Sequence, residues 1–145
     1  MYFHQLELQE IEPFTLIILE KDNLYECRWD GNEKYYQQLK KHRPYIWSSP
    51  TLYEKGIVSK REHWFASFLN GNPHPTQKDI LEFHQFTGDG DLRNDLLMER
   101  EGVYATVSIT SMLLTEDRGS MKYLDLKGNT LTERKIEFES SYEII

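Results

Sequence analysis

The chain has 145 residues, a length that fits one domain and can bury a real core. Its 17 Lys and Arg residues against 24 Asp and Glu residues give a formal net charge of -7. Because nucleic acids and anionic membrane surfaces are recognised through basic patches, this charge balance argues against both as partners.

The cysteine content indicates a reducing compartment. Cys27 is the only cysteine, so an internal disulfide and a cysteine-built zinc site are both excluded. The longest aliphatic run, residues 16–19, is far too short to span a bilayer, and the first residues lack the pattern of a signal peptide. We therefore expect a cytoplasmic protein with no membrane partner.

The first third of the chain predicts a β-hairpin followed by a helix. Residues 13–20 form a short apolar run typical of a strand that is buried on both faces. A second strand is expected at 24–29, before the turn signal Asp30-Gly31. Residues 33–41 are interpreted as a short helix that begins behind an Asn32 cap.

Two longer helices are expected in the middle of the chain. A short strand at 45–50 precedes a helix that begins near residue 54 and ends at Gly71. A second helix opens at Thr76, a typical N-cap residue, and ends near Gly88.

The last third predicts an antiparallel meander. After a loop over 88–95, apolar and polar residues alternate from 103 to 114, which indicates one long strand. Further strands are expected at 121–126 and 131–138. A hairpin, two helices and a meander together predict one domain over 1–145 of the α+β class, with antiparallel sheets and flanking helices.

The chemistry-bearing residues do not assemble a catalytic set from sequence alone. The five histidines lie far apart without H-E-x-x-H spacing, and the 88–95 loop fails the EF-hand pattern, so no metal and no cofactor are expected. Cys27 lies within a strand between Glu26 and Arg28, which is more typical of an inert structural thiol than of a nucleophile. No catalytic residue is predicted.

A substrate pocket is the remaining hypothesis for a site. It would form where the end of the 45–50 strand meets the 88–95 loop and the hydroxyl-bearing face of the long strand. The candidate residues are Ser48, Ser49, Asp91, Asn94, Asp95, Ser108 and Thr110. The alternative is that the Asp and Asn side chains of the loop bond their own backbone and that the strand hydroxyls face water.

Seven segments occur in an order that resembles one known family. They are Ile11 to Ile17, Arg28 to Gly31, Ile46 to Tyr53, Trp64-Phe65, Ile80 to His84, Gly88 to Asp91 and Thr106 to Ser111. The series resembles the C-terminal part of bacterial NRDE-family proteins, which are relatives of the animal transport and Golgi organisation family. The likeness covers most of residues 11–126, and it is the order of the segments that is specific.

The resemblance implies an N-terminal nucleophile hydrolase fold, an αββα sandwich, and hydrolysis of non-peptide amide bonds by the complete protein. The family pattern begins Met-Cys and later contains Asn-Arg-Asp-Glu, whereas residue 2 here is Tyr2 and Arg93-Asn94-Asp95 is a different motif. We therefore expect a fragment that lacks the nucleophile and is inactive alone. The alternative is a binding or trafficking module for a small apolar ligand such as haem or acyl-coenzyme A, with Trp47, Tyr53, Trp64 and Phe68 in its pocket.

Half of a two-sheet sandwich leaves apolar strand faces without cover. We therefore also expect low stability and self-association through an uncovered sheet face.

Overall fold

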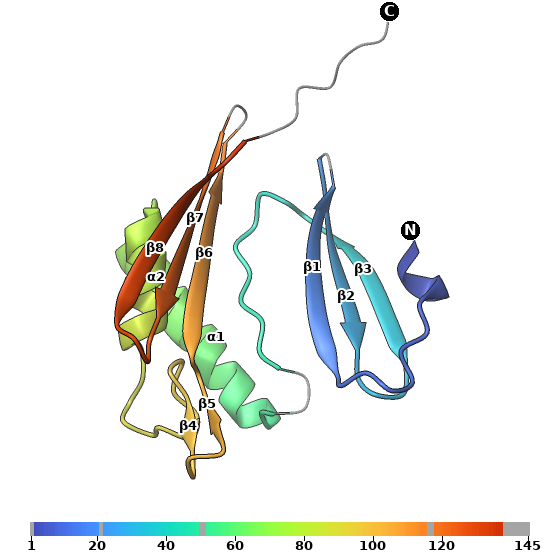
Figure 1. Cartoon of the computed structure of the whole chain (residues 1–145), viewed down its shortest axis with the longest axis horizontal. Helices are drawn as coiled ribbons and strands as arrows, with labels where there is room; N and C mark the ends of the chain where they lie inside the picture. Colours follow the sequence, from blue (N-terminus) through green and yellow to red (C-terminus); the bar gives the residue numbers. More distant parts are fainter. Residues whose placement is uncertain (1, 21, 50–51, 116–117, 138–145) are drawn as a thin grey trace, which may run out of the picture. The chain divides into compact units, whose positions relative to one another are not determined.

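The computed structural model describes residues 2–20, 22–49, 52–115 and 118–137. Within them the fold is α+β, as predicted, with three small antiparallel sheets and two α-helices (Figure 1). The chain divides into two compact units, residues 1–65 and 66–145, and each is described by itself. The elements are η1 (Tyr2–Gln5), β1 (Phe14–Glu20), β2 (Asn23–Trp29), β3 (Lys34–Leu39), α1 (Lys55–Gly71), α2 (Gln77–Phe86), β4 (Glu99–Arg100), β5 (Tyr104–Ala105), β6 (Ser108–Leu114), β7 (Gly119–Asp125) and β8 (Thr130–Ile136).

The first unit is built on the sheet β1-β2-β3, and its first two strands confirm the predicted hairpin. One face of the central strand β2 carries Cys27 and Trp29, which are buried together with Phe3 and Leu8 from the N-terminal segment. The Trp29 indole N–H donates to the carbonyl of Ile11 at 2.7 Å. The N-terminal segment is therefore the cover of this sheet face.

The helix predicted over 33–41 is wrong, because this segment forms strand β3. Gly31 adopts a φ of 96°, which favours glycine, and the Asp30 carboxylate accepts the backbone N–H groups of Asn32 and Glu33. These contacts make a tight turn that sends the chain back along β2. Tyr35 and Tyr36 suit a pleated strand, and pairing with β2 overrides the helix preference of the residues that follow them.

Two further expectations for the first unit are corrected. β1 is not buried on both faces, because Leu16 and Leu19 are 44% and 52% exposed. β1 lies at the edge of its sheet, while the N-terminal cover packs on the central strand. The described part of 45–50, residues 45–49, forms no strand; Tyr45 instead bonds the backbone of Lys40 and stacks on Trp47.

Both predicted long helices are confirmed. α1 ends at Gly71 as expected, and α2 begins after Thr76 in a capping box, in which Thr76 and Asp79 each bond the other's backbone N–H. α2 ends at Phe86, two residues before the predicted Gly88, and Thr87 caps it. The Gln77 side chain ties α2 to the sheet: its amide N–H donates to the Ser111 carbonyl at 3.3 Å.

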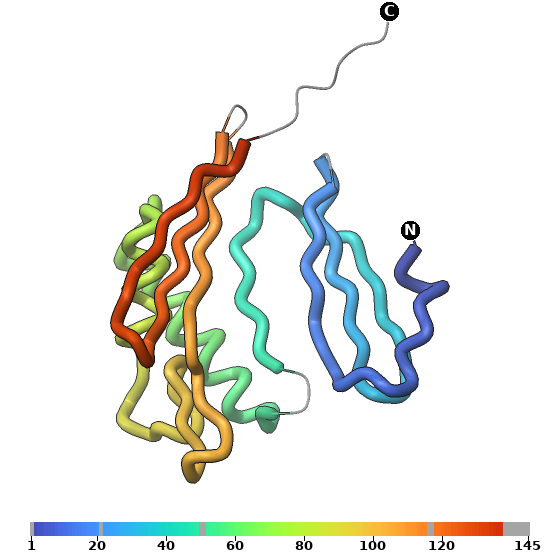
Figure 2. Tube along the Cα trace, viewed as in Figure 1, coloured from blue at the N-terminus to red at the C-terminus, as the bar shows by residue number. Residues whose placement is uncertain are grey.

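The long strand predicted over 103–114 is divided in the structure. β5 pairs with the short β4, and β6 begins only at Ser108. Thr106 causes the division, because its N–H donates to the Met98 carbonyl at 2.8 Å and its hydroxyl accepts the Met98 N–H at 3.0 Å. β7 and β8 follow as predicted, to within a few residues, and complete the sheet β6-β7-β8 (Figure 2).

The two faces of the β6–β8 sheet differ. Paired residues of an antiparallel sheet share a face, and Ser120, whose hydroxyl donates to the Gln77 side chain, marks the face toward α2. Met112, Leu114 and Tyr123 fall on the opposite face by register and are 59%, 41% and 41% exposed. Leu113 and Leu131, which lie on the α2 side by register, are 47% and 55% exposed. Both faces of this sheet therefore carry exposed apolar side chains, and α2 is tied to one of them through Gln77.

Candidate functional site

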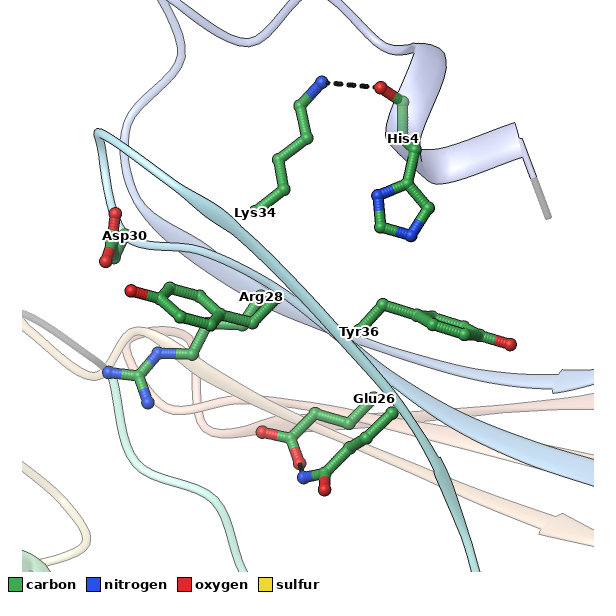
Figure 3. Close-up of a pocket in the computed structure, with 8 residues that line it drawn as sticks. His4, Glu26, Arg28, Asp30, Lys34 and Tyr36 are labelled. Carbon is green, nitrogen blue, oxygen red and sulfur yellow. Dashed lines mark hydrogen bonds between the residues drawn. The ribbon is translucent and has the colours of Figure 1, made fainter.

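A groove of about 770 Å³ runs along β3 in the first unit (Figure 3). It lies on both sides of this edge strand, so it is an open channel along the strand and not an enclosed cavity. By register, one side is lined by Glu26, Arg28, Asp30, Tyr35 and Gln37, and the other by His4, Lys34 and Tyr36.

The acidic groups on the first side are held by hydrogen bonds. The backbone N–H groups of Glu33 and Asn32 donate to Asp30 at 2.7 and 2.9 Å and hold the pKa of Asp30 below its usual value. Bonding to Asp30 and the negative charge of Asp30 raise the pKa of the Tyr35 phenol. Glu26 accepts the Gln37 amide at 2.7 Å. At neutral pH this side therefore presents carboxylates and a protonated phenol.

Arg28 is the exception on this side. Its guanidinium is close enough to Asp30 to help lower the pKa of that carboxyl, yet the Arg28 side chain forms no hydrogen bond or ion pair with another described residue. Within the described ranges, its Nε is the buried side-chain polar atom that has no hydrogen-bond partner. The Arg28 Nε–H group has therefore lost hydration without gaining a hydrogen-bond acceptor.

The second side of the groove fixes the N-terminal segment. The Lys34 ammonium donates to the carbonyls of His4, at 3.0 Å, and Leu6. The Tyr36 ring stacks on Tyr25 at 5.4 Å and meets the His4 ring edge-on at 5.7 Å. Burial is the main cause that raises the pKa of Tyr36. These rings form a rigid wall beside the strand.

No nucleophile faces this groove. The Cys27 thiol is fully buried on the covered face of β2, and burial raises its pKa, with a smaller contribution from Glu26. A raised pKa disfavours the thiolate, which is the reactive form. The arrangement of phenols, carboxylates, an amide and one cation is suited to binding.

The loop candidates Asp91, Asn94 and Asp95 do come together. Asp95 is buried, and its carboxylate accepts the backbone N–H groups of Asp89 at 2.9 Å and Gly90 at 3.1 Å. The Asn94 amide donates to Asp91 at 2.7 Å. The Asp side chains of this loop thus bond the loop's own backbone, as the alternative interpretation expects, whereas Asn94 bonds the side chains of Asp91 and Arg100.

The serine and threonine candidates lie in different units. Ser108 and Thr110 line a hollow of about 270 Å³ together with His84. Ser48 and Ser49 belong to the first unit and line a hollow of about 300 Å³ beside Thr15. A pocket shared by all seven candidates stays a prediction.

The groove residues were missed because the segment over 33–41 was interpreted as a helix. The Gly31-Asn32 pair was the available signal, since a two-residue loop with Gly at its first position is a hairpin turn sequence. Applied here, it would have placed Tyr35 beside Arg28 on one sheet face.

The aromatic residues proposed for a ligand pocket have separate neighbours. Trp47 stacks on Tyr45 at 5.5 Å, and the Lys60 ammonium lies 5.1 Å from the Trp64 ring. The guanidinium of the buried Arg61 lies 3.8 Å from the centre of the Tyr53 ring. Phe68 packs on Phe83 with ring centres 4.8 Å apart, and His84 meets Phe83 edge-on.

The chain matches no family model, no curated protein and no solved structure. Among the described residues, no three His, Cys, Asp or Glu side chains come together to hold a metal ion. Neither α1 nor α2, nor any other helix in the described ranges, has the length and apolar character to cross a bilayer.

Proposed function

We propose that this chain is the non-catalytic C-terminal part of an NRDE-family protein with the αββα sandwich of N-terminal nucleophile hydrolases, and that alone it hydrolyses no substrate. The observation that carries the proposal is the two-sided character of the β6–β8 sheet. α2 is tied to one face through Gln77, and large apolar side chains are exposed on the other.

This pattern is what one half of an αββα sandwich requires. In that architecture each sheet carries helices on its outer face and packs its inner face against a second sheet. Met112, Leu114 and Tyr123 would lie on the inner face, where each fully buried side chain contributes about 1.5–3 kcal/mol.

The chemistry of Cys27 supports the absence of activity. Its thiol is buried and its pKa is raised, so it is a poor substitute for the family's N-terminal cysteine. The chain would then supply structure to a site whose nucleophile lies elsewhere.

The test is to express this chain together with the coding sequence that lies in frame directly upstream. We expect that extension to begin Met-Cys and to contain Asn-Arg-Asp-Glu, and the extended protein to hydrolyse acyl amides only while the N-terminal cysteine is present. A Cys→Ala variant of the extended protein is the control. An upstream sequence without these motifs, or an extended protein that turns over no acyl amide, would overturn the proposal.

The ligand-carrier alternative lacks comparable support. Trp47 and Trp64 have separate aromatic and cationic neighbours, and no contact joins them in one pocket. Titration with haem and with acyl-coenzyme A, followed by tryptophan fluorescence, is still the direct comparison, and saturable quenching would favour this alternative over the first proposal.

A further inference from the structure

β3 is an edge strand whose outer hydrogen-bonding groups can be assigned. The Asp30 N–H donates to the Glu33 carbonyl at 3.3 Å, which makes this the first hydrogen-bonded pair of the β2–β3 ladder. Because such pairs alternate along an antiparallel ladder, the N–H and C=O groups of Lys34, Tyr36 and Gln38 point away from β2. Within the described residues no further strand pairs with β3.

This edge lacks the protection that edge strands usually carry. Its one charged residue is Lys34, whose ammonium bonds the carbonyls of His4 and Leu6, and from Tyr35 to Leu39 it has neither a charged residue nor a proline. The edge strand β8 of the other sheet, by contrast, carries Glu133, Arg134 and Lys135 in succession. Charged side chains of this kind deter strand addition. The edge strands β1, from Phe14 to Leu19, and β6 are also uncharged. β3 differs from them in the groove of about 770 Å³ that runs along it and is lined by Arg28.

Arg28 lies on the sheet face next to this edge. It is opposite Tyr35 in the ladder and shares its side of the groove (Figure 3). A strand added outside β3 would run two strand spacings, about 10 Å, from β2. An arginine and a glutamate side chain together span that distance. A carboxylate on the added strand can therefore satisfy a guanidinium that has no ion pair within the described chain.

We propose that the free edge of β3 binds an extended peptide segment as an added antiparallel or parallel strand, and that an acidic side chain of this peptide pairs with Arg28. Main-chain bonds to Lys34, Tyr36 and Gln38 supply the affinity, and Arg28 supplies the selectivity for a carboxylate. The Tyr36 and Tyr35 rings flank the peptide on the two sides of the strand.

A second copy of this chain fits the edge less well. Its β3 has no acidic residue from Lys34 to Leu39 to offer Arg28. Glu26 of such a copy would stand three strand spacings from Arg28, roughly 14 Å.

Measuring peptide binding to the full chain directly tests the proposal that β3 binds an acidic peptide as an added strand. The probe is a fluorescein-labelled heptapeptide of alternating Thr and Val with one central Glu, and the comparison peptide carries Gln in its place. We expect saturable binding by fluorescence anisotropy, at least tenfold tighter for the Glu peptide, and loss of this preference in Arg28→Gln. The matched control Arg134→Gln, an exposed arginine of β8, should keep the preference.

A backbone variant separates strand addition from simple charge attraction. Gln38→Pro removes an outward N–H, which an edge strand tolerates, and should abolish binding while the circular dichroism spectrum is unchanged. Gln38→Ala also removes the side-chain bond to Asn23 but keeps the N–H, so it should bind normally. In the wild type, the bound peptide should slow amide hydrogen exchange at Lys34, Tyr36 and Gln38.

Three outcomes would overturn the proposal. They are equal affinity for the two peptides, no saturable binding of either, and a dimer of the chain that Gln38→Pro dissociates. A dimer that Gln38→Pro dissociates would mean that a second copy of the chain, and not a peptide, pairs with β3.

Discussion

The two larger sheets of this protein have the same topology and leave different parts exposed. Each has three antiparallel strands in chain order. The N-terminal segment covers one face of the β1–β3 sheet, while the edge strand β3, which carries no charge after Lys34, pairs with no further strand among the described residues. The β6–β8 sheet has one charged edge strand, β8, and presents apolar side chains on the face away from α2, besides Leu113 and Leu131 on the α2 side. An unpaired edge can hydrogen-bond an added strand, whereas an exposed apolar face is stabilised when a second layer packs against it. The two sheets therefore indicate different kinds of partner.

The largest expected effect tests the covered face of the first sheet. Trp29→Ala removes a buried ring and its hydrogen bond to the Ile11 carbonyl, and leaves a cavity beside Phe3 and Leu8. We expect a loss of about 3–5 kcal/mol in the free energy of unfolding, measured by chemical denaturation. Trp47→Ala removes a 36% exposed ring and should cost much less. Equal losses in the two variants would mean that Trp29 is not in a core.

The next effect concerns the loop that follows α2. A Cβ at Gly88 would lie 2.3 Å from the carboxylate carbon of Asp95, which is buried and bonded to the loop backbone. Gly88→Ala should therefore destabilise the protein by about 1–3 kcal/mol in thermal unfolding. Gly71→Ala is the matched control, because a Cβ there meets nothing within 4 Å. A neutral Gly88→Ala would show that the Asp95 contacts are not rigid.

A smaller effect is expected at the start of α2. Thr76→Ala removes the side-chain acceptor for the Asp79 N–H and should cost about 1 kcal/mol in denaturant unfolding. Ser67→Ala, at an exposed interior position of α1, should be neutral or slightly stabilising. If both substitutions behave alike, the capping box does not contribute to stability.

The smallest effect is a pH dependence at the same cap. The hydroxyl and the N–H of Thr76 both donate to Asp79 and lower the pKa of that carboxyl from 3.8. A lowered folded-state pKa contributes stability that is complete above 3.8 and is lost as the pH falls through the folded value. Asp79→Asn should thus be less stable than the wild type at pH 7, and the difference should vanish in strong acid. A difference that persists there would assign the effect to packing.

Local signals in the sequence predicted much of the fold. The N-cap Thr76, the terminal Gly71 and the β1–β2 hairpin follow from residues that interact with near neighbours, so a single sequence carries them. β3 was missed because its conformation depends on pairing with β2, a tertiary contact that overrides weak helix propensity.

Prediction of the candidate site from the sequence has the same limit, because contacts between residues that are distant in sequence are not predicted. The loop residues Asp91, Asn94 and Asp95 were brought together correctly because they are close in sequence. The groove that holds Arg28 and Tyr35 depends on strand register, which no short motif reports. The break at Thr106 was missed for the same reason, since its partner Met98 lies outside the alternating pattern.

The open face of the β6–β8 sheet is the central claim, and its most direct test is the molar mass of the chain in solution. The measurement is size-exclusion chromatography with light scattering, together with binding of an apolar dye. The account predicts that the wild type binds the dye and forms species larger than 17.3 kDa. Met112→Thr combined with Tyr123→Thr should reduce both, whereas Leu92→Thr, at an exposed apolar position in the loop between α2 and β4 and on no sheet face, should not. A wild-type monomer that binds no dye and melts sharply at high temperature would contradict the claim.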